Sequence, residues 1–292
     1  IAGLRQRVTL RILKVFPDDP VTAHLAAALM TGQRGGLPED VLAAMRDAGL
    51  AHLLAISGLH MGLLASLVFF ASRALMALVA PLALRWPIKK IAAALALTAA
   101  FAYLLMTGAT VPTRRAFMMT ALVLIAVMLD RRAVSMGLVA WAAGAVLLIA
   151  PESLTGPGFQ MSFAAVVGLI AVYERWQPYL TAWQRGEGAG PGRGRKILLY
   201  IFGVSLTTIV ASLATAPFAV AHFGRLATWG LAANLLAVPV MALWIMPWAL
   251  AAFVLMPLGL EQLALLPMGV GINFVLEVAR HVAAWPGAVK VL

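Results

Sequence analysis

Hydrophobic and polar positions divide the chain into a short polar N-terminal part and a much longer apolar part. Within the first 16 residues, apolar side chains recur at helical spacing while basic ones occupy the other sides, which predicts an amphipathic helix. Two more short helices are expected over residues 21–30 and 38–49, the latter with acidic residues in its first turn. All three are too short and too polar to cross a bilayer, so residues 1–50 are predicted to be amphipathic helices at the membrane surface.

From His52 onward, apolar stretches recur at lengths near the roughly 20 residues that a helix needs to cross a bilayer. The seventh stretch contains Pro239 and Pro247, which indicates a broken or re-entrant helix. Residues 51–292 are therefore predicted to form an all-α, polytopic membrane domain with about eight transmembrane or re-entrant helices. The spans are expected near residues 55–80, 88–107, 112–129, 134–150, 159–176, 197–217, 231–256 and 262–284.

Composition supports this fold class. Hydrophobic residues make up 63% of the 292 and charged residues 11%, and the mean hydropathy is +0.95, which excludes a water-soluble domain. A formal net charge of +11 fits contact with anionic lipid or with an anionic substrate. Because the chain begins at Ile1 and has no signal-peptide pattern, we expect it to be an interior piece of a longer protein.

Basic residues predict the orientation of the spans. Nine of them fall in three loops that parity places on one side, and the positive-inside rule makes that side cytoplasmic. A Gly- and Arg-rich stretch at about 177–196 is then a flexible cytoplasmic linker, while residues 1–50, the start of the first span and the C-terminus face outward. The residues that set this orientation are Arg85, Lys89, Lys90, Arg131, Arg132, Arg185, Arg193, Arg195 and Lys196.

One basic pair departs from this rule. Arg114 and Arg115 lie at the predicted outer start of the third span, beside Pro112. Two cations at a helix N-terminus repel each other and oppose the helix dipole, and a bound anion would relieve both strains. The alternative is that these arginines snorkel to the membrane interface as anchors.

The stretch HLLAISGLHMG, from His52 to Gly62, places polar residues at the mouth of the first span. Ser57 and His60 are three residues apart and share a helix face, so they either bond to a neighbouring helix or form a polar constriction on a path through the membrane. Gly58 and Gly62 form a GxxxG pair on another side, which is typical of a face where a second helix or chain approaches closely.

Other polar residues on the predicted spans are further candidates. Gln160 and Ser162 bring amide and hydroxyl groups to the outer end of the fifth span, with helix packing as the alternative. The sixth span carries a hydroxyl stripe that lines a lumen or else bonds to its own helix backbone, namely Ser205, Thr208, Ser212 and Thr215. The eighth span carries a structural ion pair or a substrate contact among Asn273, Glu277, Arg280 and His281.

Motifs for metal or cofactor chemistry are missing from the sequence. The five histidines are scattered and there is no cysteine, so no metal site is predicted. Phosphate-loop and nucleophile-elbow motifs do not occur, so we expect no cofactor. An intramembrane hydrolase that uses Ser57 and His60 is an alternative, although no third catalytic group is evident.

Three stretches, in order, resemble the membrane-embedded competence domain of the ComEC-type DNA uptake channels: ALMTGQRGGLPEDVLAAMRDAGLAHLLAISGLHMGLLA, GATVPTRRAFMM and PESLTGPGFQMSFAAVVGL. The resemblance covers most of the chain and is strongest from about residue 25 to 175. It implies a multi-pass channel in the bacterial inner membrane that passes single-stranded DNA into the cytoplasm during natural transformation. A secondary transporter for a small anion is the alternative, because it would also use outward arginines and broken helices.

The resemblance also implies partners and roles. Besides DNA and lipid, we expect OB-like and metallo-β-lactamase-like domains in the full-length protein, a periplasmic DNA receptor, and a cytoplasmic DNA motor or single-strand-binding protein. Because the nuclease-like domain typical of the family is absent from these 292 residues, the resemblance implies no enzymatic activity of this chain. The path lies within one chain or between the copies of a homodimer. Arginines at the rim would recruit phosphates and weak hydrogen bonds would follow along the lumen, so the path or gate would comprise Ser57, Gly58, His60, Arg114, Arg115, Gln160 and Ser162.

Overall fold

The computed structural model describes residues 2–54, 56–131, 135–185 and 193–291. These residues are almost entirely helical, apart from a short antiparallel ribbon of β1 (Arg225–Ala227) and β2 (Val289–Val291) in which Leu226 faces Lys290. Seven helices among them are long and apolar enough to cross a membrane. The prediction of a polytopic helical membrane protein is therefore confirmed.

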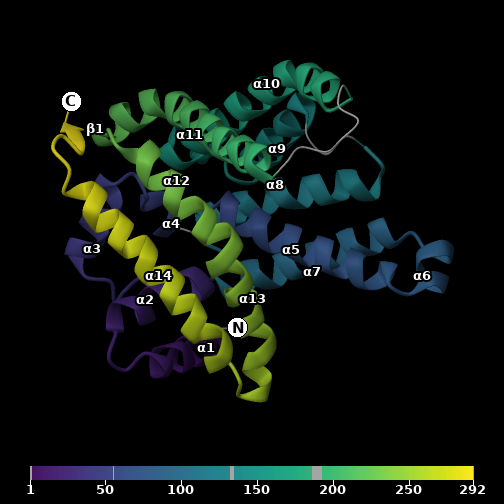
Figure 1. Cartoon of the computed structure of the whole chain (residues 1–292), viewed down its shortest axis with the longest axis horizontal. Helices are drawn as coiled ribbons and strands as arrows, with labels where there is room; N and C mark the ends of the chain where they lie inside the picture. Colours follow the sequence, from purple (N-terminus) through teal and green to yellow (C-terminus); the bar gives the residue numbers. More distant parts are fainter. Residues whose placement is uncertain (1, 55, 132–134, 186–192, 292) are drawn as a thin grey trace.

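Helices succeed one another along the whole chain (Figure 1). The first half contains α1 (Ala2–Val15), α2 (Pro20–Thr31), α3 (Glu39–Asp47), α4 (Ala51–Leu54), α5 (Gly58–Ala77), α6 (Ala80–Arg85), α7 (Ile88–Met106) and α8 (Val111–Met128). The second half contains α9 (Met136–Ile149), the 3-10 turn η1 (Pro151–Thr155), α10 (Pro157–Arg185), α11 (Arg193–Phe223), α12 (Gly230–Val240), the π segment η2 (Met241–Ile245), α13 (Met246–Leu255), η3 (Met256–Leu258) and α14 (Gln262–Ala283).

Each predicted span corresponds to a helix, with three differences. The helix α9 has only 14 residues, which extend about 21 Å and fall short of a hydrocarbon core of about 30 Å. The seventh span is not broken, because α12, η2, α13 and η3 continue one another. The linker is shorter than predicted, since α10 extends to Arg185 and α11 begins at Arg193. Residues 186–192 of that linker, and Arg132, lie outside the described residues.

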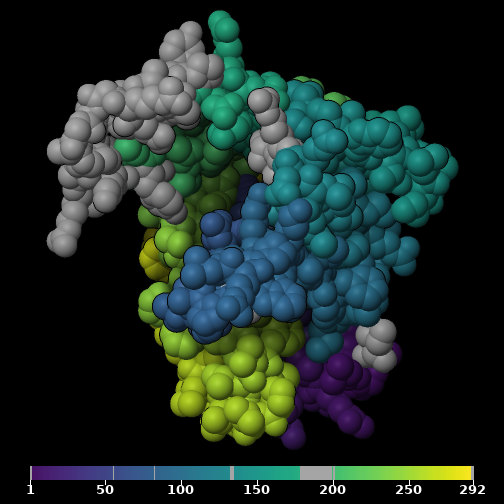
Figure 2. All heavy atoms as spheres, turned by 90° about the vertical axis from the view of Figure 1, so that its right-hand side faces the viewer, coloured from purple at the N-terminus to yellow at the C-terminus, as the bar shows by residue number. Residues whose placement is uncertain are grey.

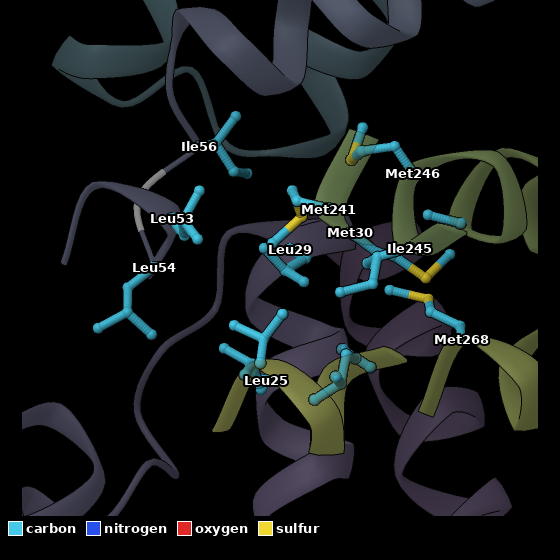
Figure 3. Close-up of a cluster of buried hydrophobic side chains, with 14 of the residues drawn as sticks. Leu25, Leu29, Met30, Leu53, Leu54, Ile56, Met241, Ile245, Met246 and Met268 are labelled. Atoms are coloured by element: carbon cyan, nitrogen blue, oxygen red, sulfur yellow. The ribbon is translucent and has the colours of Figure 1, made fainter. Parts of the chain in front are cut away.

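The helix α2 lies in the main hydrophobic core. Nine of its 12 residues are buried, including Leu25, Leu29 and Met30. In Figure 3 these side chains lie among those of η2 and α14, which are far away in the sequence. The prediction of a surface helix is wrong for α2, because a helix that is apolar all round is driven into the protein interior. The hydrophobic cluster thus crosses the domain boundary predicted at residue 50.

Polar groups around α2 find partners inside the protein. The hydroxyl of Tyr103 on α7 donates to the carbonyl of Leu29 at 2.6 Å. On the α1 side, the hydroxyls of Thr9 and Thr31 lie 3.0 Å apart, and both residues are buried. These bonds offset the cost of removing polar groups from water, and they tie α1 and α7 to α2.

The α12–α14 hairpin depends on close helix contact at its π segment. A Cβ at Gly271 of α14 would lie 2.6 Å from a ring carbon of Trp244 in η2, so only glycine fits there. The indole N–H of Trp244 donates to the carbonyl of Pro267 at 2.8 Å. The interruption that the prolines predicted therefore takes the form of a π segment that is pinned to α14.

One ion pair bears on how the hairpin sits in the membrane. Arg11 of α1 donates two hydrogen bonds of 2.6 Å to the carboxylate of Glu261, in the turn before α14. Parity places this turn on the cytoplasmic side, whereas α1 is predicted to face outward. Because the ion pair holds α1 beside the turn, these two predictions conflict: either α1 or the turn lies on the side opposite to the one predicted.

The Arg11–Glu261 pair makes stability depend on pH. Burial alone would raise the pKa of Glu261, but the hydrogen bonds from Arg11 outweigh it and hold the pKa below its ordinary value of 4.5. A folded-state pKa below the unfolded one means that the stabilisation is fully present above pH 4.5 and is lost as the pH falls through the folded-state pKa.

We therefore expect Glu261→Gln to lower the melting temperature at neutral pH, by the loss of about 1–3 kcal/mol for charge-assisted hydrogen bonds. Thermal unfolding of purified protein between about pH 3 and pH 8 tests this, and the difference from wild type should shrink at the acidic end. Glu277→Gln, which removes an exposed pair with Arg280, is the control and should have a much smaller effect. A difference in melting temperature between Glu261→Gln and wild type that does not change with pH would contradict the assignment of this stabilisation to the Arg11–Glu261 pair.

Candidate functional site

The first turn of α5 is closed by a reciprocal cap. The hydroxyl of Ser57 accepts a hydrogen bond from the N–H of Leu59 at 3.2 Å. In return, Nδ1 of His60 lies 3.3 Å from the backbone nitrogen of Ser57 and 3.1 Å from its hydroxyl. This is a capping box in which histidine takes the place of the usual Glu or Gln, so the pair satisfies polar groups at the helix start.

His60 faces the protein core. Its side chain is 0% exposed, and its neighbours Met61 and Leu64 belong to the main hydrophobic cluster. Among the described residues, its Nε2 has no hydrogen-bond partner. Ser57 and His60 therefore bond to each other within one helix start, and the polar constriction proposed for this pair stays a prediction.

Gly58 and Gly62 face a cavity. No heavy atom lies within 4 Å of the position that a Cβ would take at either residue. Among the described residues, no other helix comes close enough at these positions to make the contact expected of a GxxxG pair, and contact with a second chain stays a prediction. Both glycines instead line a cavity of about 440 Å³ between α5, α8, α9 and α10.

The walls of this cavity are almost wholly apolar. Its largest side chains are Phe69 and Phe70 from α5 and Met119 from α8, and its hydroxyls are those of Ser66, Thr120 and Ser135. It is open on one side rather than enclosed. Figure 2 shows the molecule from the α6 end, with its surface hollowed between the blue helices and the teal and green ones. Sequence analysis missed this cavity, although a four-residue spacing of small and apolar residues on α5, α8 and α10 indicates facing ridges.

The two arginines at the start of α8 have different surroundings. Arg114 is exposed, while Arg115 is partly buried against the first turn of α10. A Cβ at Gly158 would lie 2.4 Å from Nη1 of Arg115, so the glycine leaves room for the guanidinium. The Nε atom of Arg115 is buried and has no hydrogen-bond partner among the described residues. The hypothesis of an anion bound by this pair stays a prediction.

Gln160 joins three elements at the same end of the helices. Its Oε1 accepts a hydrogen bond of 2.8 Å from Nε2 of His222 at the end of α11, and its Nε2 donates to the carbonyl of Leu154 in η1. Ser162 lies on the next turn of α10 and is partly buried. Sequence analysis did not single out His222, although its place at the end of α11, opposite the start of α10, was the feature that could have indicated it.

The remaining candidates fall outside this region. None of the hydroxyls in the α11 stripe lines the cavity, and that of Thr215 donates to the carbonyl of Ala211 in its own helix at 2.8 Å. On α14, Arg280 pairs with Glu277 at 2.9 Å on an exposed face, and the amide of Asn273 donates to Asp19 at the start of α2. The choice between a structural ion pair and a substrate contact on α14 stays open.

Two features of the described side chains bear on chemistry. Nδ1 of His60 is engaged by the cap, and no described group orients its Nε2. No three His, Asp or Glu side chains within the described ranges are close enough to hold a metal ion. The arrangement therefore combines an apolar cavity with an exposed and a partly buried cation at one end.

Comparison with known protein families gives one match over most of the chain. The model of the family described as "Competence protein" matches residues 29–292. No solved structure matches the chain.

Among curated relatives, ComE operon protein 3 of Bacillus subtilis (strain 168) is 26% identical over 256 residues, which cover 87% of this chain and 29% of that protein. Competence protein ComA of Neisseria gonorrhoeae is 35% identical over 151 residues, 50% of this chain and 21% of that protein. The uncharacterized protein YcaI of Escherichia coli (strain K12) is 29% identical over 223 residues, which cover 76% of this chain and 28% of that protein. The chain thus spans less than a third of the length of these relatives.

The capping box predicts a structural effect of Ser57 and His60. Ser57→Ala removes the oxygen that accepts from Leu59, so we expect a loss of about 1 kcal/mol and a lower melting temperature of the purified protein. Ser66→Ala, which removes a hydroxyl from the cavity wall, is the matched control and should leave the melting temperature nearly unchanged. Equal melting temperatures for Ser57→Ala and wild type would contradict a capping role.

Proposed function

Because the chain belongs to the competence protein family, we propose that it is the membrane-embedded part of a channel that carries single-stranded DNA into the cytoplasm during natural transformation. The supporting observation is the family match, which covers residues 29–292 and thus nearly the whole helical assembly. Competence proteins act in DNA uptake, and the seven membrane-length helices suit a protein that works inside a membrane.

Electrostatics favours the helix ends around Arg114 as the place where the strand first binds. Each nucleotide carries a phosphate, so a path needs cations at its rim and few strong traps inside. Arg114 is exposed there, next to Arg115, and contacts from Arg115 to Gly158 and from Gln160 to His222 join the starts of α8 and α10 to the end of α11. This end of the bundle is the proposed rim.

The surrounding apparatus is part of the same proposal. We place the chain in the bacterial inner membrane, with a periplasmic DNA receptor on one side and a DNA motor or single-strand-binding protein on the other. OB-like and metallo-β-lactamase-like domains in the full-length protein would bind and degrade DNA, and this chain would contribute passage without catalysis.

A hydrolase that uses Ser57 is less well supported. The 3.1 Å contact between the hydroxyl of Ser57 and Nδ1 of His60 has the length of a catalytic hydrogen bond. However, the hydroxyl also accepts from the N–H of Leu59, and His60 is fully buried, so capping accounts for the contact. Labelling of Ser57 by a serine-reactive probe would favour the hydrolase instead.

The rim hypothesis predicts that Arg114→Ala combined with Arg115→Ala, in the full-length protein, lowers transformation frequency about tenfold or more, because phosphate contacts are lost. Nuclease-resistant internal DNA and membrane abundance are measured together, and surface-bound DNA should stay unchanged. Arg73→Ala, an exposed arginine at the other end of α5, is the control. Wild-type uptake in the double variant would remove the rim hypothesis.

The orientation is testable by single-cysteine labelling, since the chain has no native cysteine. An impermeant thiol reagent applied to cells with a permeabilised outer envelope should label Glu152→Cys but not Arg85→Cys, because the positive-inside rule makes the second loop cytoplasmic. Leu260→Cys, in the exposed turn before α14, tests the hairpin. Labelling from the cytoplasmic side alone would show that the hairpin crosses the bilayer and that α1 does not face outward.

A further inference from the structure

The cavity between α5, α8, α9 and α10 is apolar along most of its length, and Arg115 lies near one of its ends. On α8 one row of lining residues recurs every four positions, and Arg115 stands one turn before its first member: Met119, Val123 and Val127. A second row on the same helix consists of Ala116, Thr120 and Leu124. On α10 the same spacing runs from Gly158, which touches Arg115, to Val166 and Ile170 in the cavity wall. A guanidinium therefore stands at the head of an apolar groove.

The length of the groove suits an acyl chain. It follows α5 from Gly58 to Phe70, which is about 18 Å at the helical rise of about 1.5 Å per residue. Its walls are mostly apolar, and it is partly open. An extended alkyl chain can lie along such a groove with its methylene groups against the wall.

We propose that this groove binds one phospholipid, with an acyl chain along Gly58 and Gly62 and the phosphate beside Arg115. The groove length is close to the depth of one leaflet, about half of the roughly 30 Å hydrocarbon core. Hydrocarbon is the medium around α5 and α8, and an empty apolar groove there would forgo its dispersion contacts. The inference gives Arg115 to the lipid phosphate, so within the proposed rim it leaves the exposed Arg114 to the transported strand.

Charge complementarity identifies the head of the occupant. The Nε of Arg115 is buried without a hydrogen-bond partner among the described residues, and a partly buried guanidinium favours an anion that accepts several of its N–H groups. A phosphate meets this demand. The first N–H groups of α10 around Gly158 lack intrahelical acceptors and would add to the binding.

The test uses the full-length protein in membranes that contain a phospholipid with a photoreactive group on its acyl chain. After irradiation, peptide mass spectrometry maps the crosslinks, and native mass spectrometry counts the lipids that are retained in detergent. We expect crosslinks in the groove segments of α5 and α8, and one phospholipid per chain that resists delipidation.

Two glycine variants test the groove and a third serves as the matched control. Gly58→Leu and Gly62→Leu place a side chain into open space in the groove and should lower the crosslinks there about tenfold. Gly144→Leu on α9 also enters open space but lies outside the groove, so it should leave the crosslinks unchanged. Arg115→Gln keeps the groove and should weaken retention of the phospholipid about tenfold, without an equal effect on a neutral diacylglycerol probe.

Three results would overturn the proposal. The first is crosslinking in the groove of wild type that is no stronger than crosslinking at Trp141, an exposed residue of α9. The second is crosslinking that survives both glycine variants. The third is a groove occupied by a segment of a second copy or of another protein, seen as protein–protein crosslinks from a photoreactive residue at Ser66. The elution profile of each variant shows whether that variant is folded. The crosslinks of the wild type test the proposal without any variant.

Discussion

The burial of α2 requires the polar groups around it to bond inside the protein. The bond from Tyr103 to the carbonyl of Leu29 and the contact between Thr9 and Thr31 hold α7 and α1 against this helix. At the other end, Asn273 of α14 binds Asp19, which caps α2. Helices from the beginning, middle and end of the chain therefore meet around one short segment, and the start of α5 is placed by this core.

Placement against the core divides α5 into two functionally different faces. His60, Met61 and Leu64 face the core, and the cap between Ser57 and His60 sets where the helix begins. Gly58 and Gly62 lie on the uncovered side and line the apolar groove. Ser57 and His60 thus cap the helix, and the two glycines lie in the wall of the groove that we propose for a phospholipid.

The apolar groove and the basic rim suit different ligands. A nucleic acid strand needs water and exchangeable polar contacts, which the groove walls do not provide, while Arg114 is exposed at the rim. The partly buried Arg115 stands between the two, with its guanidinium against α10. Lipid in the groove would fix α5 against α8 and α10 without occupying the exposed arginine, so both ligands are compatible with one structure.

The sequence by itself determined the helical membrane class, the positions of the spans and the family, because these follow from hydrophobic runs and short motifs that are local in the chain. It also indicated a departure from a regular helix near Pro239, since proline removes a backbone donor wherever it lies. Only the tertiary structure decided that α2 is buried, that His60 faces the core and that Gly58 and Gly62 face a groove. Helical spacing shows which residues share a face, but the partner of each face comes from distant parts of the chain, and no local pattern specifies which faces are covered.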